Sequence, residues 1–288
     1  MTAPPLAGVE QLVKRFPLTR GVVFRRRLGE VAAVDGVTLS VQEGESLGIV
    51  GETGSGKSTL ARMLLNLLEP TSGVVRYRGE DVTHARGAQL AALRRKRQLV
   101  FQDPAGSLNP RKTIGAAVAD PFAIHGLLPE RAARARRVGE LLEQVGLEAS
   151  SANRYPHELS GGMRQRVGIA RAIALGPELL VADEPVSALD VSIQAQILTL
   201  LRELRRELGL TLVLIAHDLA VVRHMCDRVA VMHDGRLVEV APVEELYRAP
   251  REAYTRELLA AVPRIPGPAA PVAGPPPASG PQSSSSST

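Results

Sequence analysis

A glycine-rich run at residues 51–59 reads Gly-Glu-Thr-Gly-Ser-Gly-Lys-Ser-Thr and carries the residue types that hold phosphate. Glycines let the backbone curl so that several N–H groups face one anion, and the positive end of a following helix adds to the attraction. At the end of such a run a lysine can reach the β- and γ-phosphates and a hydroxyl can bind Mg²⁺, the roles expected of Lys57 and Ser58. The run therefore predicts a nucleoside triphosphate site. Its expected lining residues are Gly51, Glu52, Thr53, Gly54, Ser55, Gly56, Lys57, Ser58 and Thr59.

The sequence on either side of this run is typical of a strand and a helix. The apolar residues 46–50 precede it, and residues 60–65 follow it with helical spacing. A glycine-rich turn that happens to precede a helix would satisfy the pattern alone. The strand–loop–helix context is what separates a working P-loop from such a turn, so the sequence favours a P-loop.

Two adjacent carboxylates, Asp183 and Glu184, follow the apolar run 179–182. Ligands of open α/β sheets bind at the carboxyl ends of the strands, where this pair would lie. Asp183 can hold Mg²⁺ through its water shell, and Glu184 can polarise an attacking water as a general base. An Asp-Glu pair at a strand end is common on protein surfaces. With an apolar run before it and a P-loop upstream, the pair instead indicates phosphoryl transfer to water.

A second anion-binding element is expected at residues 159–162, which read Leu-Ser-Gly-Gly. At the start of a helix, the hydroxyl of Ser160 and the amides of Gly161 and Gly162 can all point at phosphate. The chain therefore carries two phosphate-binding elements, and their separation in sequence does not make them obviously parts of one pocket.

The hydrophobic pattern predicts the elements that position these residues. Residues 8–45 alternate apolar and polar side chains and are expected to form antiparallel strands, with 17–30 as an inserted loop. Apolar runs such as 211–216 are typical of a parallel sheet covered on both faces. Strands alternate with helices, which indicates a three-layer α/β core, and the helical stretch 103–174 is expected to stand beside it as an insertion.

Composition limits the remaining possibilities. The net charge is +5, and the basic residues gather mainly at 25–27, 94–97 and 131–137. They could face an anionic partner, but without interleaved aromatics a solvated surface is favoured. The one cysteine, Cys226, excludes an internal disulfide. No apolar run has the length of a membrane span, and no signal-peptide pattern is expected at the N-terminus. A folded domain over 1–262 and a disordered Pro- and Ser-rich tail over 263–288 are expected.

The order of these motifs resembles that of the ATP-binding-cassette (ABC) ATPases over about residues 9–262. The resemblance implies a P-loop NTPase of the ABC-ATPase type, with a mostly parallel sheet, an antiparallel β subdomain and a helical insertion. It also implies the cofactors ATP and Mg²⁺ and the reaction, ATP hydrolysis coupled to transport. Two cassettes of this family pair head to tail, so that the signature of one, here Ser160, Gly161 and Gly162, contacts the γ-phosphate bound by the other.

The same resemblance implies roles for further residues. Gln102 would touch Mg²⁺ and the attacking water, and His217 would hydrogen-bond the γ-phosphate as the switch histidine. Phe16, or alternatively Phe24, would stack on adenine. The implied catalytic residues are Glu184, His217, Lys57 and Gln102, and the implied magnesium ligands are Ser58, Gln102 and Asp183. The loop coupling the two ATP sites would be Ser187, Ala188, Leu189 and Asp190.

Four segments narrow the resemblance to the second ATPase subunit of bacterial dipeptide and oligopeptide importers. These segments are 101–104 with 107–111, 155–158, 183–192 and 254–259. The resemblance implies a peripheral protein on the cytoplasmic face of the cell membrane. Its implied partners are a sister ATPase or a second copy of itself, two membrane permeases and, indirectly, a substrate-binding protein. Nucleic acid is not expected as a partner.

Three departures from the family pattern make the cargo less certain than the ATPase activity. Met163 stands in place of the signature glutamine, Glu252-Ala253 replaces a usual His-Pro, and a cysteine-rich C-terminal extension is missing. No iron–sulfur or zinc site is therefore expected. Nickel, glutathione or another small solute remains an alternative cargo. A soluble ABC ATPase acting on DNA or ribosomes is the other alternative, although its usual paired cassettes or long coiled coil are not found here.

Overall fold

The computed structural model describes residues 4–20, 26–187 and 189–261 of the 288-residue chain. Three of the sequence predictions lie outside the described residues: Phe24 as the alternative adenine contact, Ala188 in the coupling loop, and the tail at 263–288. The boundaries given above for the domain and its helical insertion stay predictions. Within the described ranges, no helix has the length and apolar character needed to cross a membrane.

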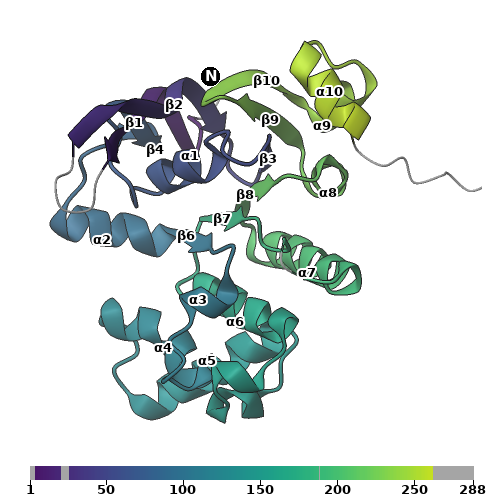
Figure 1. Ribbon diagram of the computed structural model, residues 1–288. Coiled ribbons are helices and arrows are strands. Elements are labelled where there is room, and N and C mark those ends of the chain that lie inside the picture. The colour runs from purple at the N-terminus through teal and green to yellow at the C-terminus, as the bar shows by residue number, and fades with distance from the viewer. Residues whose placement is uncertain (1–3, 21–25, 188, 262–288) are drawn as a thin grey trace, which may run out of the picture.

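A six-stranded sheet forms the centre of the molecule (Figure 1), in the order β10-β9-β3-β8-β7-β6. All neighbours are parallel except β10, which pairs antiparallel with β9 at one edge. Every residue of β3, β7 and β8 is buried, as expected for strands covered on both faces. The strands are β3 (Ser46–Val50), β6 (Arg97–Val100), β7 (Leu179–Asp183), β8 (Thr211–Ala216), β9 (Arg228–His233) and β10 (Arg236–Pro242).

A second sheet is antiparallel throughout, in the order β2-β1-β4-β5. The predicted inserted loop at 17–30 is wrong, because β1 and β2 stay paired as far as Arg20 and Arg26. Beyond Val13, β1 has no recorded pair on β4, so Pro17 lies where β1 is paired on one side only, and a strand with one unpaired side tolerates a proline. The strands are β1 (Ala7–Arg20), β2 (Arg26–Val41), β4 (Ser72–Tyr77) and β5 (Glu80–Asp81).

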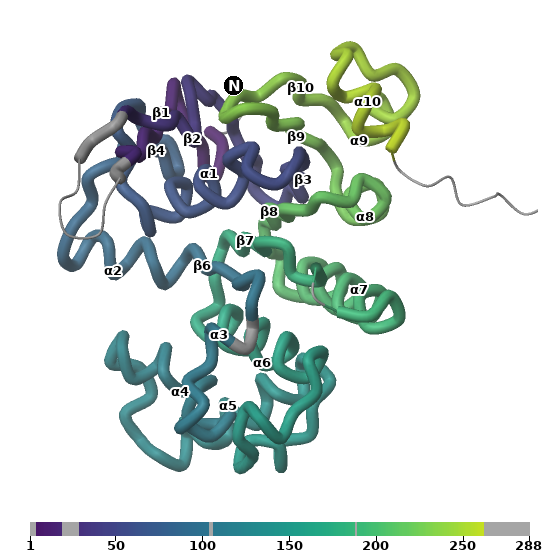
Figure 2. Tube along the Cα trace, viewed as in Figure 1, coloured from purple at the N-terminus to yellow at the C-terminus, as the bar shows by residue number. Residues whose placement is uncertain are grey.

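The helices fall into two groups (Figures 1 and 2). Helices α3 to α6 form one group that meets the central sheet through α6 and β6, and the chain enters this group from β6 and returns into β7, two strands that are neighbours in that sheet. These helices are α3 (Pro104–Ser107), α4 (Ile114–Ile124), α5 (Arg131–Gln144) and α6 (Gly161–Ile173), with 3₁₀ turns at Ala149–Asn153 and Pro156–Glu158. The others are α1 (Lys57–Leu64), α2 (Gly87–Lys96), α7 (Val191–Leu208), α8 (Leu219–Met225), α9 (Val243–Arg248) and α10 (Ala253–Ala261).

Side chains from the two faces of the central sheet enter two separate hydrophobic cores. In β8, Val213 and Ile215 pack with α1 and the antiparallel sheet, whereas Leu212 and Leu214 pack with the helices of the other side. This alternation follows from the two-residue period of a strand. The structure is therefore the layered α/β fold that the sequence predicts, with the carboxyl ends of β3, β7 and β8 at one edge of the sheet.

The basic run 94–97 is not entirely a solvated surface. Arg97 is only 3% exposed and donates hydrogen bonds to Leu64 O (3.0 Å) and Asn66 Oδ1 (2.9 Å), while its guanidinium lies over the Tyr77 ring. Burial lowers the pKa of Arg97 to about 10, so the group remains cationic at neutral pH. Because Leu64 ends α1, Arg97 satisfies a carbonyl that a helix end leaves without a partner.

An Arg97→Ala variant is expected to lower the free energy of unfolding by about 2–3 kcal/mol, because it leaves these buried acceptors without a charged donor. Arg94→Ala is the matched control, since Arg94 is exposed in the same run and its loss should change stability by less than about 0.5 kcal/mol. Urea denaturation of both variants measures the difference. Equal effects would contradict the buried role of Arg97.

Candidate functional site

The P-loop joins β3 to α1 and takes the tight curl that its glycines allow. Gly51, Gly54 and Gly56 all have φ between 89° and 148°, a region that other residues rarely enter. A Cβ added to Gly51 would lie 2.1 Å from Met232 O, and one added to Gly56 would lie 2.1 Å from Ala33 O. At these two positions the close approach of another backbone requires glycine.

The loop ends at the N-terminus of α1, which is open for an anion. Gly56 is the N-cap residue, and no side chain accepts a hydrogen bond from the first turn. The first N–H groups of a helix have no acceptor within the helix and carry the positive end of its dipole. A phosphate lying here would accept from these amides.

Lys57 is folded against its own loop. Its Nζ donates to Gly51 O and Glu52 O, both at 2.7 Å, and the residue is 4% exposed. Burial lowers the pKa of Lys57, and the nearby carboxylates of Glu184, Asp183 and Glu52 oppose that shift. The ammonium is thus held among carbonyls and faces the carboxylates at the sheet edge.

Ser58 and Asp183 meet although they lie 125 residues apart in sequence. The Ser58 hydroxyl donates to Asp183 Oδ1 at 2.8 Å, and Asp183, at the end of β7, is 3% exposed. One hydroxyl and one carboxylate are oxygen ligands of the kind that Mg²⁺ takes when phosphates and waters supply the others. In the described part of the chain no group of three or more His, Cys, Asp or Glu could hold a metal.

Glu184 has a backbone in the left-handed region. Its φ is 45°, which is uncommon for a residue with a side chain, and its N–H donates to Ile215 O at 3.0 Å on the neighbouring strand. Its carboxylate accepts a 2.8 Å hydrogen bond from Gln102 Nε2. The structure therefore brings together Gln102, from the start of the helical segment, and the predicted base.

His217 lies on the loop between β8 and α8 and is exposed. It lines one small pocket together with Glu184 and Ser187, at the same edge of the sheet. The Ser187 hydroxyl donates to Glu184 O at 3.2 Å, so the predicted coupling loop contacts the residue proposed as base. Asp190 ends that loop as the N-cap residue of α7.

Phe16 lies on β1 with 40% of its surface exposed, and the ammonium of Lys14 lies 5.3 Å from its ring centre. Among the contacts recorded for the described residues, none joins Phe16 to the P-loop. Its stacking on adenine remains a prediction.

The signature residues begin α6. Ser160 is the N-cap residue, and its hydroxyl accepts from Met163 N at 3.3 Å. A Cβ on Gly162 would lie 2.6 Å from Ile193 Cγ2, so glycine is needed where α6 approaches α7. No recorded hydrogen bond between described residues links this segment to the P-loop, and Figure 1 shows α6 in the group of helices α3 to α6. The two phosphate-binding elements do not form one pocket within the chain.

The sequence prediction missed the contact between the P-loop and helix α10. Glu52 N donates to the hydroxyl of Tyr254 at 3.3 Å, across 202 residues of sequence. Tyr254 belongs to a segment that carries the family resemblance, but no pattern in the sequence indicates that α10 returns to the P-loop.

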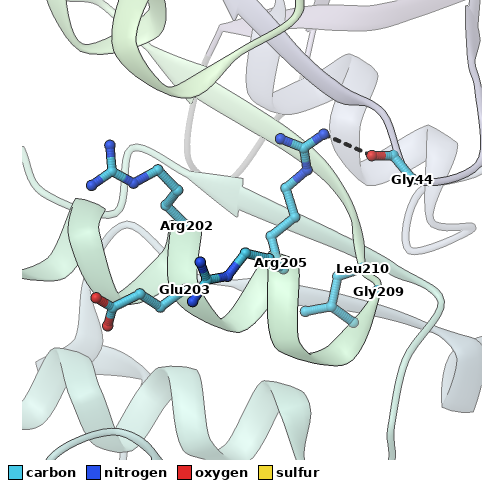
Figure 3. A pocket seen from close by; sticks show the side chains of 7 residues that line it. Gly44, Arg202, Glu203, Arg205, Gly209 and Leu210 are labelled. Carbon is cyan, nitrogen blue, oxygen red and sulfur yellow. Dashed lines mark hydrogen bonds between the residues drawn. The ribbon is translucent and has the colours of Figure 1, made fainter.

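Two larger cavities are found in the described residues, one beside the predicted site residues and one away from them. A groove of about 720 Å³ adjoins Gln102 and Asp183 and extends to Phe101, Ile124 and Arg171 of the helical segment. A pocket of about 650 Å³ lies at the far end of α7 (Figure 3), where Arg205 donates to Gly44 O. Since this second pocket contains no P-loop residue and neither Asp183 nor Glu184, it is not the nucleotide site.

Known proteins share this sequence and this fold. A family model described as "ABC transporter" matches residues 34–187. "Oligopeptide transport ATP-binding protein AppF" of Bacillus subtilis is 51% identical over 87% of this chain and 76% of its own length. "Glutathione import ATP-binding protein GsiA" of Pectobacterium atrosepticum is 48% identical over 91% of this chain and 42% of its own.

A solved structure, the dimeric post-hydrolysis state of the ATP-binding cassette MJ0796 bound to ADP and Pi, superimposes with a TM-score of 0.72 and 31% identity. It matches 82% of this chain and 98% of that one. The solved structure agrees with the layered fold described above. The chain belongs to the ABC transporter family, as an ATP-binding and ATP-hydrolysing cassette.

Proposed function

We propose that this chain powers an ABC importer whose cargo is short peptides. The observation that carries the proposal is the cluster at one sheet edge, where Ser58 meets Asp183 and Gln102 meets Glu184 beside the P-loop lysine. The cluster supports ATP hydrolysis. The peptide cargo is supported by the names of the relatives, among them the oligopeptide transport protein that is 51% identical.

In the proposed reaction, Glu184 takes a proton from the water that attacks the γ-phosphate. Gln102 donates to this carboxylate at 2.8 Å and would orient both the carboxylate and the water. Lys57 would leave the carbonyls of its loop and donate to the phosphates instead, and His217 would donate to the γ-phosphate. These donors stabilise charge on the transferring group, the main source of rate in such reactions.

Magnesium would be held by Ser58 and Asp183, with Gln102 as a further ligand. The ion neutralises charge on the β- and γ-phosphates. The chemistry of the donor set supports this role, because a hydroxyl, a carboxylate and an amide oxygen all suit a hard cation.

Head-to-tail pairing with a second cassette would complete each site. The proposal is supported by the separation of Ser160 and its glycines from the P-loop of the same chain, since a second cassette can bring such a segment to the γ-phosphate. The solved cassette structure that resembles this chain is described as dimeric. The second cassette would be a sister ATPase or another copy of this chain.

The groove beside Gln102 is the proposed contact for the permeases. Phe101 is 44% exposed and Ile124 is 77% exposed at this groove. Exposed apolar side chains that share one groove are typical of a surface that binds another protein. Because Gln102 lines the groove, closure of the ATP site would be transmitted through Gln102 to a permease segment bound there. The cassette would thus be peripheral, on the cytoplasmic face of the membrane.

One other cargo is favoured by a specific observation. The relative named for glutathione import is 48% identical, close to the oligopeptide relatives. The cargo does not contact the cassette in the proposed arrangement, so the residues of this chain do not choose between peptides and glutathione. Nickel or another small solute has no comparable support.

Co-purification tests the proposal. The chain, tagged in its native cell, should be recovered from gently solubilised membranes together with two permeases and a second ATPase. The ligand of the associated substrate-binding protein would then identify the cargo. Recovery with ribosomes or DNA-bound proteins, and without a permease, would contradict the importer and favour the nucleic-acid alternative.

A further inference from the structure

Two elements far along the chain support the P-loop from outside. The end of β9 and the turn that follows it are one of them: Met232 O of β9 lies against Gly51, and Gly235 N of the turn donates to Ser55 O at 3.1 Å. Helix α10 is the other, through the hydroxyl of Tyr254. Neither element lies within residues 34–187, which the family model matches.

Tyr254 is held in place from two sides. Its ring lies against His233, with 4.0 Å between ring centres. The backbone just before α10 is anchored by Glu239 on β10, a residue only 8% exposed, whose carboxylate accepts from Arg251 N at 3.0 Å and Glu252 N at 3.2 Å. These contacts fix Tyr254, and with it the hydroxyl that contacts the P-loop, against β9 and β10 of the central sheet.

The P-loop residue that Tyr254 contacts, Glu52, also contacts the P-loop lysine. Glu52 N donates to the Tyr254 hydroxyl at 3.3 Å, and Glu52 O accepts from Lys57 Nζ at 2.7 Å and from Ser55 N at 3.1 Å. Glu52 is thus held by its N–H from outside the loop and by its C=O from inside. The orientation of this one residue affects both the curl of the loop and the position of the lysine.

We propose that Tyr254 is a positioning residue for the nucleotide site: its hydroxyl holds Glu52 in the orientation in which the loop fits phosphate. Holding the loop before the ligand arrives reduces the ordering that binding must supply, and so increases affinity. A helix at the C-terminal end of the described chain thereby contributes to nucleotide affinity. The proposal rests on ATP binding at the P-loop and is independent of the cargo.

The test is a Tyr254→Phe variant of the full chain, titrated with MgATP by calorimetry. Loss of one hydrogen bond to a neutral group should raise the Kd by about three- to fivefold. In the assembled complex the KM for ATP should rise while kcat stays the same, because the phenol contacts no reacting atom. The melting temperature should change little.

Tyr77→Phe is the matched control. The hydroxyl of Tyr77 on β4 donates to Glu178 Oε2 at 2.6 Å, so the same atom is removed from a hydrogen bond away from the P-loop. This control should lower stability and leave the Kd for MgATP unchanged. An unchanged Kd in Tyr254→Phe, or an equal rise in both variants, would overturn the positioning role. Failure of the wild-type chain to bind MgATP would overturn the proposed function as well.

Discussion

A Glu184→Gln variant is expected to bind ATP normally and to lose about 10²- to 10³-fold in ATP turnover within the assembled complex. Glutamine keeps the size of the side chain and cannot accept a proton from water. ATP binding is kept because the phosphates contact the P-loop and the start of α1, which this change does not reach. The measurement compares phosphate release with nucleotide binding in the same preparation.

Glu207→Gln is the control for this variant, since Glu207 is an exposed carboxylate on α7, away from the nucleotide site. It should retain full turnover. If Glu184→Gln also retained full turnover, the assignment of the base would be wrong, and the strained backbone of Glu184 would need another explanation.

A Lys57→Met variant should lose most ATP binding. A hydrogen bond to a charged group contributes about 1.5–3 kcal/mol, so the Kd for MgATP is expected to rise roughly 10- to 100-fold. Methionine keeps a side chain of similar length, so the change removes the charge with little loss of packing. Calorimetric titration of the isolated chain measures the effect without the partner subunits.

Lys96→Ala is the corresponding control, because Lys96 is exposed and forms its ion pair with Glu178. Its Kd for MgATP should match that of the wild type. A Lys57→Met chain that bound MgATP as tightly as the wild type would mean that the lysine stays on Gly51 O and Glu52 O when nucleotide is present, and that it does not contact phosphate.

Much of the central sheet can be predicted from the sequence, because its strands are uninterrupted apolar runs. The predicted strands at 179–183 and 211–216 coincide with β7 and β8, and the helix that follows β7 ends before Gly209, whose φ is 62°. The antiparallel hairpin was harder to predict. Its strands continue through Pro17 and through arginines that are typical of loops, and only their pairing with each other stabilises the extended backbone.

Some contacts of the site could also be predicted from the sequence, and others could not. Ser58 and Asp183 are both predicted as magnesium ligands, and the structure brings them within 2.8 Å because β3 and β7 end at the same sheet edge. The left-handed backbone of Glu184 could not be predicted, since its neighbours in sequence do not require it. Buried Arg97 was likewise unpredictable, because its partners come from elements 31 and 33 residues away.

The most direct test of the importer is ATP hydrolysis by the purified complex of this chain, its second cassette and the permeases in lipid nanodiscs. The rate is measured with the substrate-binding protein empty and then loaded with a dipeptide. We expect that the loaded binding protein raises the rate, and that Glu184→Gln abolishes the increase. A hydrolysis rate that is the same with the empty and the loaded binding protein, but rises with duplex DNA or ribosomes, would contradict the importer function.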